Sequence, residues 1–211
     1  MTAPTGLRER KKQQTREEIA SAAMKLFTER GFDAVTVAEV AEAAGVSEKT
    51  VFNYFQAKED LVFPEGEARW EALLESIRTR PAGASLVAPF RQATHELLDQ
   101  VASGDVEQIV ARPRLVMASA ALRGRLFVWW EQEAALLAPV IAEAAGDNEG
   151  RLVSAVVART LAWTHRITFR AAFTRLLAGE DQKRVARDLR KQVDEAYDLL
   201  ECGLRDYGRR P

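Results

Sequence analysis

The stretch from Thr36 to Lys58 reads TVAEVAEAAGVSEKTVFNYFQAK and predicts two short helices joined by a tight turn. Thr36 is a suitable N-cap, and Glu39 three residues later completes a capping box. Gly45 ends the first helix, because glycine enters a left-handed C-terminal turn without steric cost. Ser47 then caps the second helix. The spacing of these signals predicts a helix-turn-helix pair.

The second helix of the pair has an apolar side and a polar side. We expect Val51, Phe52 and Phe55 to be buried against the rest of the fold. The remaining side chains have polar ends: Glu48, Lys49, Thr50, Asn53 and Tyr54. A small, rigidly held helix that presents Lys, Thr and Asn is what reading a DNA groove requires.

The chain has 211 residues, which is enough for one large domain or two small ones. With 47% hydrophobic and 29% charged residues, it has ample material for a core and a soluble surface. The lone Cys202 excludes an internal disulfide and suits a reducing cytoplasm. We find no apolar run long enough for a transmembrane helix and no signal peptide, so we expect a cytoplasmic protein without a membrane partner.

Charge is distributed unevenly, although the net charge is only -1. Residues 1–16 carry five basic side chains against one acidic one, a net +4, whereas residues 17–63 carry four basic against nine acidic, a net -5. A DNA-binding surface must therefore be local. The basic residues Arg8, Lys11, Lys12 and Arg16 form an N-terminal arm ahead of the helix pair. We expect this arm to contact phosphates or the minor groove; a solvated, disordered tail is the alternative.

Helix signals dominate the rest of the chain, and no convincing strand pattern occurs. Pro64 and Gly66 should interrupt the fourth helix, which begins near Lys58 and restarts near Glu65. Pro113 leaves the region 106–122 uncertain. The other expected helices span about 13–30, 85–102, 123–145, 150–178 and 182–207. The sequence therefore predicts an all-α fold of about nine helices.

We divide this fold into two domains. Residues 1–62 form a three-helix helix-turn-helix DNA-binding head with the basic N-terminal arm. Residues 63–211 form a larger helical bundle for effector binding and dimerisation.

Residues 14–62 resemble the tetracycline-repressor (TetR) family of bacterial transcriptional regulators. The resemblance rests on matches at the family's spacing: Thr15-Arg16-Glu17-Glu18-Ile19, Ala22-Ala23, Leu26-Phe27, Gly31-Phe32, Thr36-Val37, Val40-Ala41, Ala44-Gly45-Val46-Ser47, Thr50-Val51-Phe52-Asn53-Tyr54-Phe55 and Lys58-Glu59-Asp60-Leu61. Beyond this stretch the chain resembles the family only in the number and size of its helices.

The resemblance implies a homodimer that binds a palindromic double-stranded DNA operator and that a small molecule releases. It also implies roles for the matching residues. Thr36, Tyr54 and Lys58 would hold phosphates, and Ser47, Lys49, Thr50 and Asn53 would lie on or beside base edges.

The chain departs from the family's pattern at two places. Gln56-Ala57 replaces the Pro-Ser or Pro-Thr of many relatives, and Tyr54 stands where His is common. Ala57 is a poor N-cap, and Lys58 is unfavourable at the positive end of a helix without an anion. We therefore expect a bound phosphate to order the start of this helix.

Aromatic and histidine side chains of the C-terminal half are candidates for a small, largely apolar effector. They are Trp70, Phe90, His95, Phe127, Trp130, Trp163, His165 and Phe169. Ordinary core packing of the aromatic rings, and structural hydrogen bonds of the histidines, remain the alternatives. Two isolated His and one distant Cys have no metal-ligand spacing, so we expect no metal site and no cofactor.

The last helix carries an apolar stripe at intervals of three or four residues. Its members include Val185, Leu189, Val193, Tyr197, Leu200 and Leu204. Such a stripe can form a four-helix bundle across a two-fold axis, and we expect it to be the dimer interface. Packing of the same stripe within one chain is the alternative.

The lead hypothesis is a ligand-responsive repressor, whose interrupted fourth helix would couple effector to DNA. The alternatives are a homodimeric DNA-binding regulator without a physiological ligand, or an activator. We expect no enzyme, because the sequence has no nucleotide-binding loop, metal cluster or Ser/His/Asp arrangement, and therefore no catalytic residues.

Overall fold

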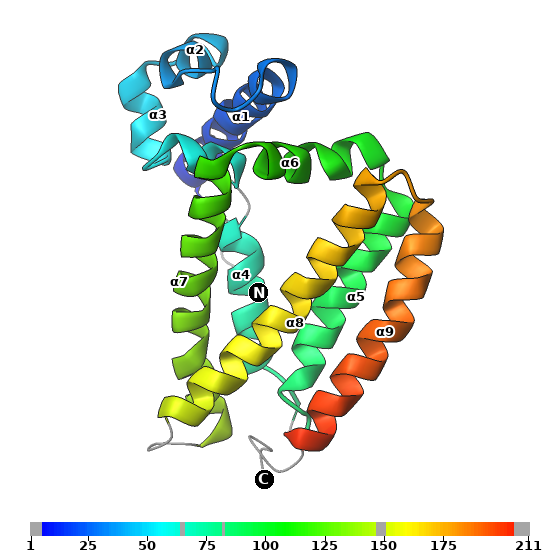
Figure 1. Ribbon diagram of the computed structural model, residues 1–211. Helices are drawn as coiled ribbons and strands as arrows, with labels where there is room; N and C mark the ends of the chain where they lie inside the picture. Colours follow the sequence, from blue (N-terminus) through cyan, green and yellow to red (C-terminus); the bar gives the residue numbers. More distant parts are fainter. Residues whose placement is uncertain (1–5, 64–65, 82, 147–150, 205–211) are drawn as a thin grey trace. The chain divides into compact units, whose positions relative to one another are not determined.

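A computed structural model describes residues 6–63, 66–81, 83–146 and 151–204. Over these ranges the regular structure is entirely helical, which confirms the predicted all-α fold (Figure 1). The elements are α1 (Leu7–Arg30), α2 (Val37–Ala43), α3 (Glu48–Tyr54), the 3-10 helix η1 (Lys58–Val62), α4 (Gly66–Arg78), α5 (Val87–Ser103), α6 (Val106–Ala118), α7 (Ala120–Ala145), α8 (Arg151–Leu177) and α9 (Gln182–Gly203). None of these helices is long and apolar enough to cross a membrane.

The chain forms two compact units. The first, here called the head unit, comprises Met1–Glu67 together with Ala111–Arg125. The second, the C-terminal unit, comprises Ala68–Val110 and Leu126–Pro211. The head unit is thus built from two separate stretches of sequence, because the end of α6 and the start of α7 pack with the first helices.

Helix α1 begins at Leu7, six residues earlier than the predicted start at Gln13. Arg8, Lys11 and Lys12, which were expected to precede this helix, therefore lie within it. Lys, Arg, Gln and Glu are good helix formers. Side-chain bonds one turn apart also support the helix, since Gln13 donates to Glu17 at 2.8 Å and Gln14 to Glu18 at 2.9 Å.

Helices α2 and α3 form as their capping signals predict. The Thr36 hydroxyl accepts from the Glu39 amide while the Glu39 carboxylate accepts from the Thr36 amide, so the capping box is complete. Gly45 has a φ of 67°, in the left-handed region that favours glycine. The Ser47 hydroxyl accepts from the Thr50 amide at 3.1 Å and starts α3. These local bonds fix both ends of the turn.

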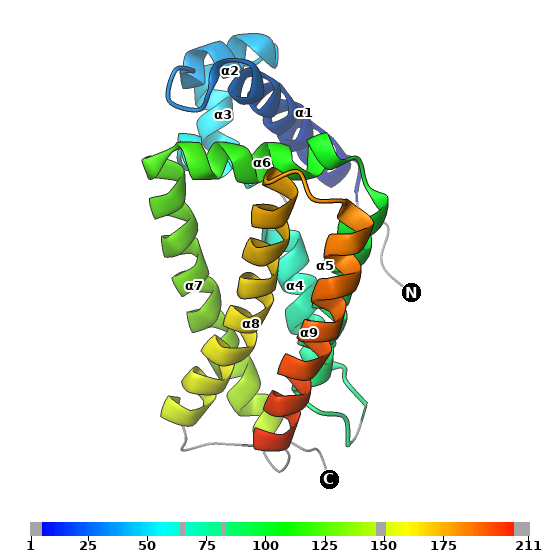
Figure 2. The same cartoon turned by 45° about the vertical axis from the view of Figure 1, so that its right-hand side comes forward.

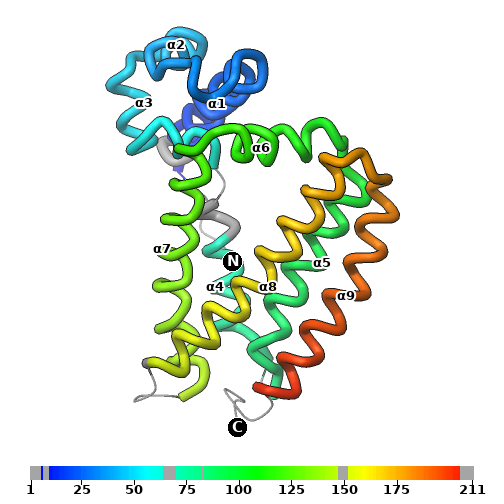
Figure 3. The backbone as a smooth tube through the Cα atoms, in the orientation of Figure 1, coloured from blue at the N-terminus to red at the C-terminus, as the bar shows by residue number. Residues whose placement is uncertain are grey.

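The predicted break in the fourth helix is present. The helix η1 ends at Val62 and α4 begins at Gly66, whereas Pro64 and Glu65 lie outside the described residues. Pro113, by contrast, does not end α6, which continues from Val106 to Ala118. Helix α7 also begins earlier than predicted, at Ala120, and contains Pro139 (Figure 3).

The core of the C-terminal unit lies among α5, α8 and α9, which run side by side (Figure 2). Phe90 on α5, Leu161 on α8 and Val193 on α9 are each at most 3% exposed. Gly104 allows the tight connection after α5, since a Cβ atom there would lie 2.7 Å from the Ile109 side chain. The predicted end of α9 near Tyr207 lies outside the described residues, and the helix runs to Gly203.

Candidate nucleic-acid interface

The exposed side of α3 presents Glu48, Lys49, Phe52 and Asn53. These positions follow i, i+1, i+4 and i+5 spacing and therefore share one helix face. The prediction that Phe52 belongs to the core is wrong, because its side chain is 51% exposed. Val51 alone fills the inner side of this short helix, and Phe55 is buried just after it. The sequence reasoning missed Phe52 because an apolar residue beside two buried ones has the periodicity of a core position.

The hydroxyls predicted to touch DNA take part in the cap of α3. Ser47 Oγ lies 2.8 Å from Thr50 Oγ1 and also accepts from the Thr50 backbone amide. Ser47 is exposed, and the Thr50 and Tyr54 side chains are half-buried. The capped start of α3 thus holds Ser47 and Thr50 in fixed positions at its edge, as recognition of a rigid duplex would require.

Arg16 fastens α1 to the C-terminal end of α3. Its guanidinium donates to the Tyr54 carbonyl at 3.0 Å and lies 4.7 Å above the Phe55 ring. A cation at this end of a helix also complements the negative end of the helix dipole. Arg16 was predicted as part of a DNA-contacting arm, and in the structure it positions α3.

Lys58 has partners within the head unit. Its ammonium donates to the Phe32 carbonyl at 2.6 Å and lies 4.2 Å from the centre of the Phe32 ring, an attractive cation–π geometry. The interaction accounts for a lysine at the start of η1 without a bound anion. An ammonium has three donors, so the bond to Phe32 leaves capacity for a phosphate.

Asp60 satisfies the helix start for which the sequence suggested a phosphate. Its carboxylate accepts from the Ala57 amide at 3.0 Å, which supplies the cap that the Ala57 side chain lacks. The other carboxylate oxygen accepts from Arg125 at the start of α7, at 2.7–2.8 Å. Nearby, Ser119 donates to Asp33 at 3.0 Å. These two bonds join residues 111–125 to the rest of the head unit.

Thr36 is exposed but its hydroxyl is engaged. It lies 2.8 Å from a Glu39 carboxylate oxygen, and Glu39 also pairs with Arg30 at 2.8 Å. Hydrogen bonds from the Thr36 backbone and side chain, together with Arg30, lower the pKa of Glu39 to about 2. The carboxylate therefore stays charged at neutral pH and keeps the start of α2 ordered.

The remaining basic residues of the predicted arm project from the first turns of α1. Lys11 and Lys12 are exposed. Arg8 lies in α1, but its side chain is outside the described part of the molecule. Among the described residues, no ion pair engages Lys11 or Lys12, so both remain candidates for phosphate contact.

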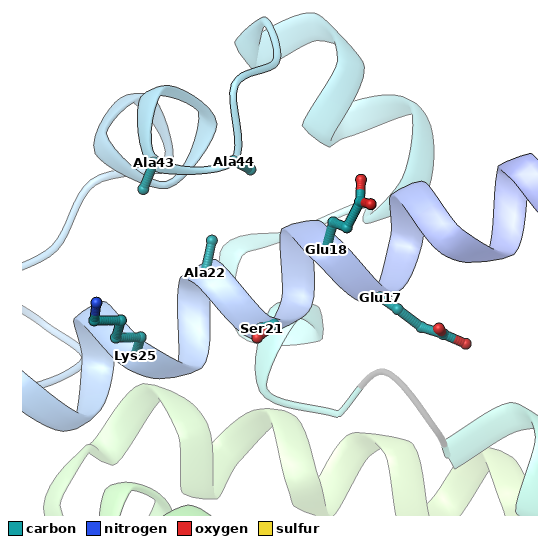
Figure 4. Close-up of a pocket in the computed structure, with 7 residues that line it drawn as sticks. All are labelled: Glu17, Glu18, Ser21, Ala22, Lys25, Ala43 and Ala44. Atoms are coloured by element: carbon teal, nitrogen blue, oxygen red, sulfur yellow. The ribbon is translucent and has the colours of Figure 1, made fainter.

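A shallow, open depression of about 560 Å³ lies between α1 and the end of α2 (Figure 4). It is lined by Glu17, Glu18, Ser21, Ala22, Lys25, Ala43 and Ala44. Its lining combines two carboxylates and Lys25 with three alanines. This chemistry suits neither a DNA backbone nor an apolar effector, so we do not assign it to either site.

In the C-terminal unit, the predicted effector residues lie in different environments. Phe90 is fully buried in the core, whereas Phe127 is 57% exposed. Phe169 packs on Phe173 with ring centres 4.1 Å apart. Trp70 is half-buried beside the core, and its indole Nε1 is buried without a hydrogen-bond partner among the described residues. These residues therefore do not indicate one common effector cavity.

Trp130 and Trp163 do come together, around an ion pair that the sequence reasoning missed. Their rings meet edge to face at 5.8 Å, and the Arg166 guanidinium lies 5.2 Å from the Trp130 ring. Arg166 donates to Glu133 at 3.0 Å, and both side chains are nearly buried. Burial raises the pKa of Glu133 to about 7, against the opposing effect of Arg166. The sequence signal for this ion pair was Arg166, a charged residue within the apolar run of α8.

Both predicted histidines have structural partners. His95 lies 2.9 Å from Asp194 on α9. His165 Nδ1 lies 2.8 Å from Thr94 Oγ1, which also lies 2.9 Å from the Tyr197 hydroxyl. Because the single Thr94 proton goes to the Phe90 carbonyl, Tyr197 and His165 Nδ1 must be the donors. Burial raises the pKa of Tyr197 to about 12, which keeps its hydroxyl protonated.

The apolar stripe of α9 does not form an exposed interface. Val185, Leu189, Val193 and Tyr197 are at most 6% exposed, and all four belong to the core of their own chain. Leu200 and Leu204 are half-buried against the same core. For Val185, Leu189, Val193 and Tyr197 the predicted dimer interface is therefore wrong, because these side chains pack within the chain, against α5 and α8. Leu200 and Leu204 keep exposed surface, and their place in an interface stays a prediction. The hydrophobic period was correct, but it could not show which surface covers it.

An exposed apolar stripe occurs instead on α8. It consists of Leu152, Val156, Trp163 and Ile167, which are 45–78% exposed. Their spacing of four, seven and four residues places them on one face of the helix. A stripe of this kind, on a helix whose opposite side is buried, is typical of an interaction surface.

Comparisons with known proteins agree with the geometry of the helix pair. Residues 19–63 match the family described as bacterial regulatory proteins, tetR family. This segment therefore has the sequence of a tetR-family DNA-binding domain. The match covers α1 from Ile19, the helix pair and η1, which are the elements that position α3.

Two relatives are similar to this chain beyond the matched segment. TcmR, a helix-turn-helix transcriptional regulator of Streptomyces glaucescens, is 31% identical over 73% of this chain and 64% of its own length. The chain thus spans slightly less than two thirds of TcmR. The Mycobacterium tuberculosis transcriptional regulator MftR is 24% identical over 92% of this chain and 93% of its own length.

A solved structure shares the fold over most of the chain. The SmeT–triclosan complex has a TM-score of 0.55 and 18% identity, and the match covers 87% of this chain and 91% of SmeT. At this level of identity the similarity extends to the fold alone. Both units of this chain thus have counterparts in a known fold.

Proposed function

We propose that this protein is a homodimeric repressor that binds a palindromic DNA operator through α3 and is released by a small, largely apolar molecule. The observation that carries the proposal is the outward face of α3, which presents Lys49, Phe52 and Asn53 on a helix capped by Ser47 and braced by Arg16. Side chains on such a helix reach base edges without further ordering. Thr36, Tyr54, Lys58 and the α1 lysines would hold the flanking phosphates.

The DNA-binding proposal is tested by selecting bound fragments from random and genomic DNA at physiological salt, then footprinting the enriched sequence. We expect protection of a pseudo-palindrome. Lys49→Ala should weaken binding at least tenfold, whereas Lys183→Ala, an exposed lysine on α9, should leave it unchanged. Lack of any enriched sequence would reject the proposal.

The second copy in the dimer would cover the exposed stripe of α8. Specific recognition of a palindrome needs two heads, and a stripe of Leu152, Val156, Trp163 and Ile167 repeats in the manner of a helix–helix seam. In a two-fold arrangement the same stripe from each copy would meet its equivalent. The predicted dimer is thus retained, with α8 in place of the α9 stripe.

Sedimentation of charge variants tests this surface. Val156→Glu and Ile167→Glu should convert the dimer to a folded monomer, because each would bury a charge in the seam. Leu199→Glu changes a residue of α9 that is 76% exposed and should leave the dimer intact. Dimers that persist in both α8 variants would move the interface elsewhere.

The effector proposal draws on two observations. SmeT, whose fold this chain shares, is known in complex with triclosan. Among the residues that the structure describes, the buried Trp70 Nε1 has no hydrogen-bond partner, which is costly unless an acceptor such as a ligand oxygen reaches it. An apolar molecule with one acceptor would suit the surroundings of Trp70. Regulators without a ligand have no comparable need for an unpaired indole.

A thermal-shift screen of apolar compounds, followed by operator release, tests for the effector. A hit should stabilise the protein and lower its operator affinity reciprocally. Trp70→Phe keeps the ring but removes the N–H, so it should weaken effector binding about tenfold and leave operator binding unchanged. Equal effector affinity in both proteins would remove Trp70 from the site.

Coupling between effector and DNA would use two of the three covalent connections between the units. The broken helix η1–α4 is one. Helix α7 is the other, because it is continuous from Ala120 to Ala145 and its first turns are tied to the head unit by Arg125 and Asp60. A shift of α7 on effector binding would therefore be transmitted directly to η1.

A further inference from the structure

We propose that Phe52 reads thymine in the operator, through contact of its ring with the C5-methyl group of that base in the major groove. The inference rests on the proposed DNA-binding function and adds a specificity-determining residue to it. No polar group of α3 can supply this reading, because a methyl group offers neither a donor nor an acceptor.

The ring of Phe52 is exposed in the free protein. Phe52 is 51% exposed, although Val51 and Phe55 on the same segment are 1% and 2% exposed. The head unit therefore completes its core without this side chain. Exposing a large aromatic ring to water is unfavourable. A smaller or polar residue would serve the free protein better, so the ring is explained by something that covers it in a complex.

The ring also lies among exposed polar side chains. Phe52 lies one turn after Glu48 and Lys49 and directly before Asn53, all of them exposed. It is thus flanked on the same face by the side chains best suited to guanine and adenine edges. Any surface that meets Lys49 and Asn53 must also meet Phe52.

The chemistry of the Phe52 ring indicates which group on DNA would contact it. A phenyl ring cannot bind a phosphate, since it has no hydrogen-bond donor, and the nearby Glu48 carboxylate also repels phosphate. Among the groups on base edges in the major groove, the thymine methyl is the one that is apolar. The outward face of α3 accordingly combines two polar readers with one apolar reader.

The test uses the full-length protein and operators selected from random DNA. Each thymine is replaced in turn by deoxyuridine, which removes only the methyl group. We expect one thymine in each half-site to show an effect. Replacing it in one half-site should weaken binding of wild-type protein about fourfold, and replacing it in both half-sites about sixteenfold. These are the losses expected for one and for two buried methyl groups.

Phe52→Ala should bind the thymine operator about as weakly as wild type binds the doubly substituted one, and should not distinguish thymine from uracil. Phe52→Leu keeps an apolar side chain and should retain part of the methyl effect. Met117→Ala is the matched control, since Met117 is also an exposed apolar residue of the head unit, at 63%, and its methyl effect should equal that of wild type.

Three results would overturn the inference: no thymine shows a methyl effect, Phe52→Ala keeps the effect, or Phe52→Ala binds as tightly as wild type. Circular dichroism and melting of Phe52→Ala exclude loss of folding as the cause. Failure of the proposed function is distinguishable, because then no sequence would be enriched in the selection at all.

Discussion

The head unit and the C-terminal unit place their polar side-chain bonds at different distances along the chain. In the head unit most of these bonds join residues three or four apart, as in Thr36 with Glu39 and Ser47 with Thr50. In the C-terminal unit many more of them join distant helices, as in Glu133 with Arg166. Local bonds set the ends of individual helices, whereas distant bonds set how helices pack. The head is therefore preset for recognition, and the other unit depends on its buried interior.

The largest effect should come from the interior of the C-terminal unit. Phe90→Ala removes a ring that is 1% exposed and should lower the free energy of unfolding by about 3–5 kcal/mol. Phe127→Ala, at an exposed aromatic of the same unit, should change it by less than about 0.5 kcal/mol. Urea unfolding measures both. Similar losses in the two variants would show that Phe127 is covered in the folded protein.

The buried ion pair should make the stability of the C-terminal unit depend on pH. The pKa of Glu133 is raised from an ordinary 4.5 to about 7, so the folded state binds a proton that the unfolded state releases. Stability should therefore be highest below about pH 4.5 for this group and fall by on the order of 3 kcal/mol as the pH rises through 7.

Melting from pH 5 to pH 8 checks this direction. Glu133→Gln should flatten the decline in Tm, because glutamine does not titrate. Glu131→Gln removes an exposed carboxylate that pairs with Arg159 and should keep the wild-type slope. A slope unchanged in Glu133→Gln would assign the pH dependence to another group.

A third prediction concerns one of the distant bonds of the head unit, between Asp60 and Arg125. Arg125→Gln and Asp60→Asn should each destabilise the head unit by about 1–2 kcal/mol, since the pair is hydrogen-bonded and partly buried. The double variant should cost less than the sum of the single ones. Hydrogen exchange of the η1 amides is the measurement. Additive losses would mean that the two residues act independently.

The smallest effect should come from a local cap. Thr36→Ala removes the acceptor of the capping box and should cost about 1 kcal/mol, confined to α2. Thr36→Ser keeps the hydroxyl and should cost much less. Exchange of the α2 amides separates the two. If Thr36→Ala opened both units equally, the distinction between local and distant bonding would fail.

The same distinction explains what could be predicted from the sequence. The caps at Thr36 and Ser47, the turn at Gly45 and the break before Gly66 all follow from neighbouring residues, and each is present. The all-α fold and the core helices followed from periodicity. The start of α1 was missed because charged residues form a helix here without an apolar stripe.

The roles of individual side chains in the interior could not be predicted in this way. Periodicity identified the stripe of α9 but not its partners, which lie on the preceding helix α8 and on α5, about a hundred residues earlier in the sequence. It also placed Phe52 in the core, because neighbouring helix positions differ by only about 100° in direction. The pairing of Glu133 with Arg166 depends on the packing of α7 against α8, which neighbouring residues do not encode.

The bonds from Ser119 to Asp33 and from Arg125 to Asp60 also have a consequence for hybrid regulators. A chimera that exchanges only residues 1–62 would give the transplanted head a foreign segment in place of 111–125, and both aspartates would lose their partners. Grafts that carry 111–125 along with the N-terminal residues should transfer operator choice intact. In this protein, the exchangeable module is therefore discontinuous in the gene.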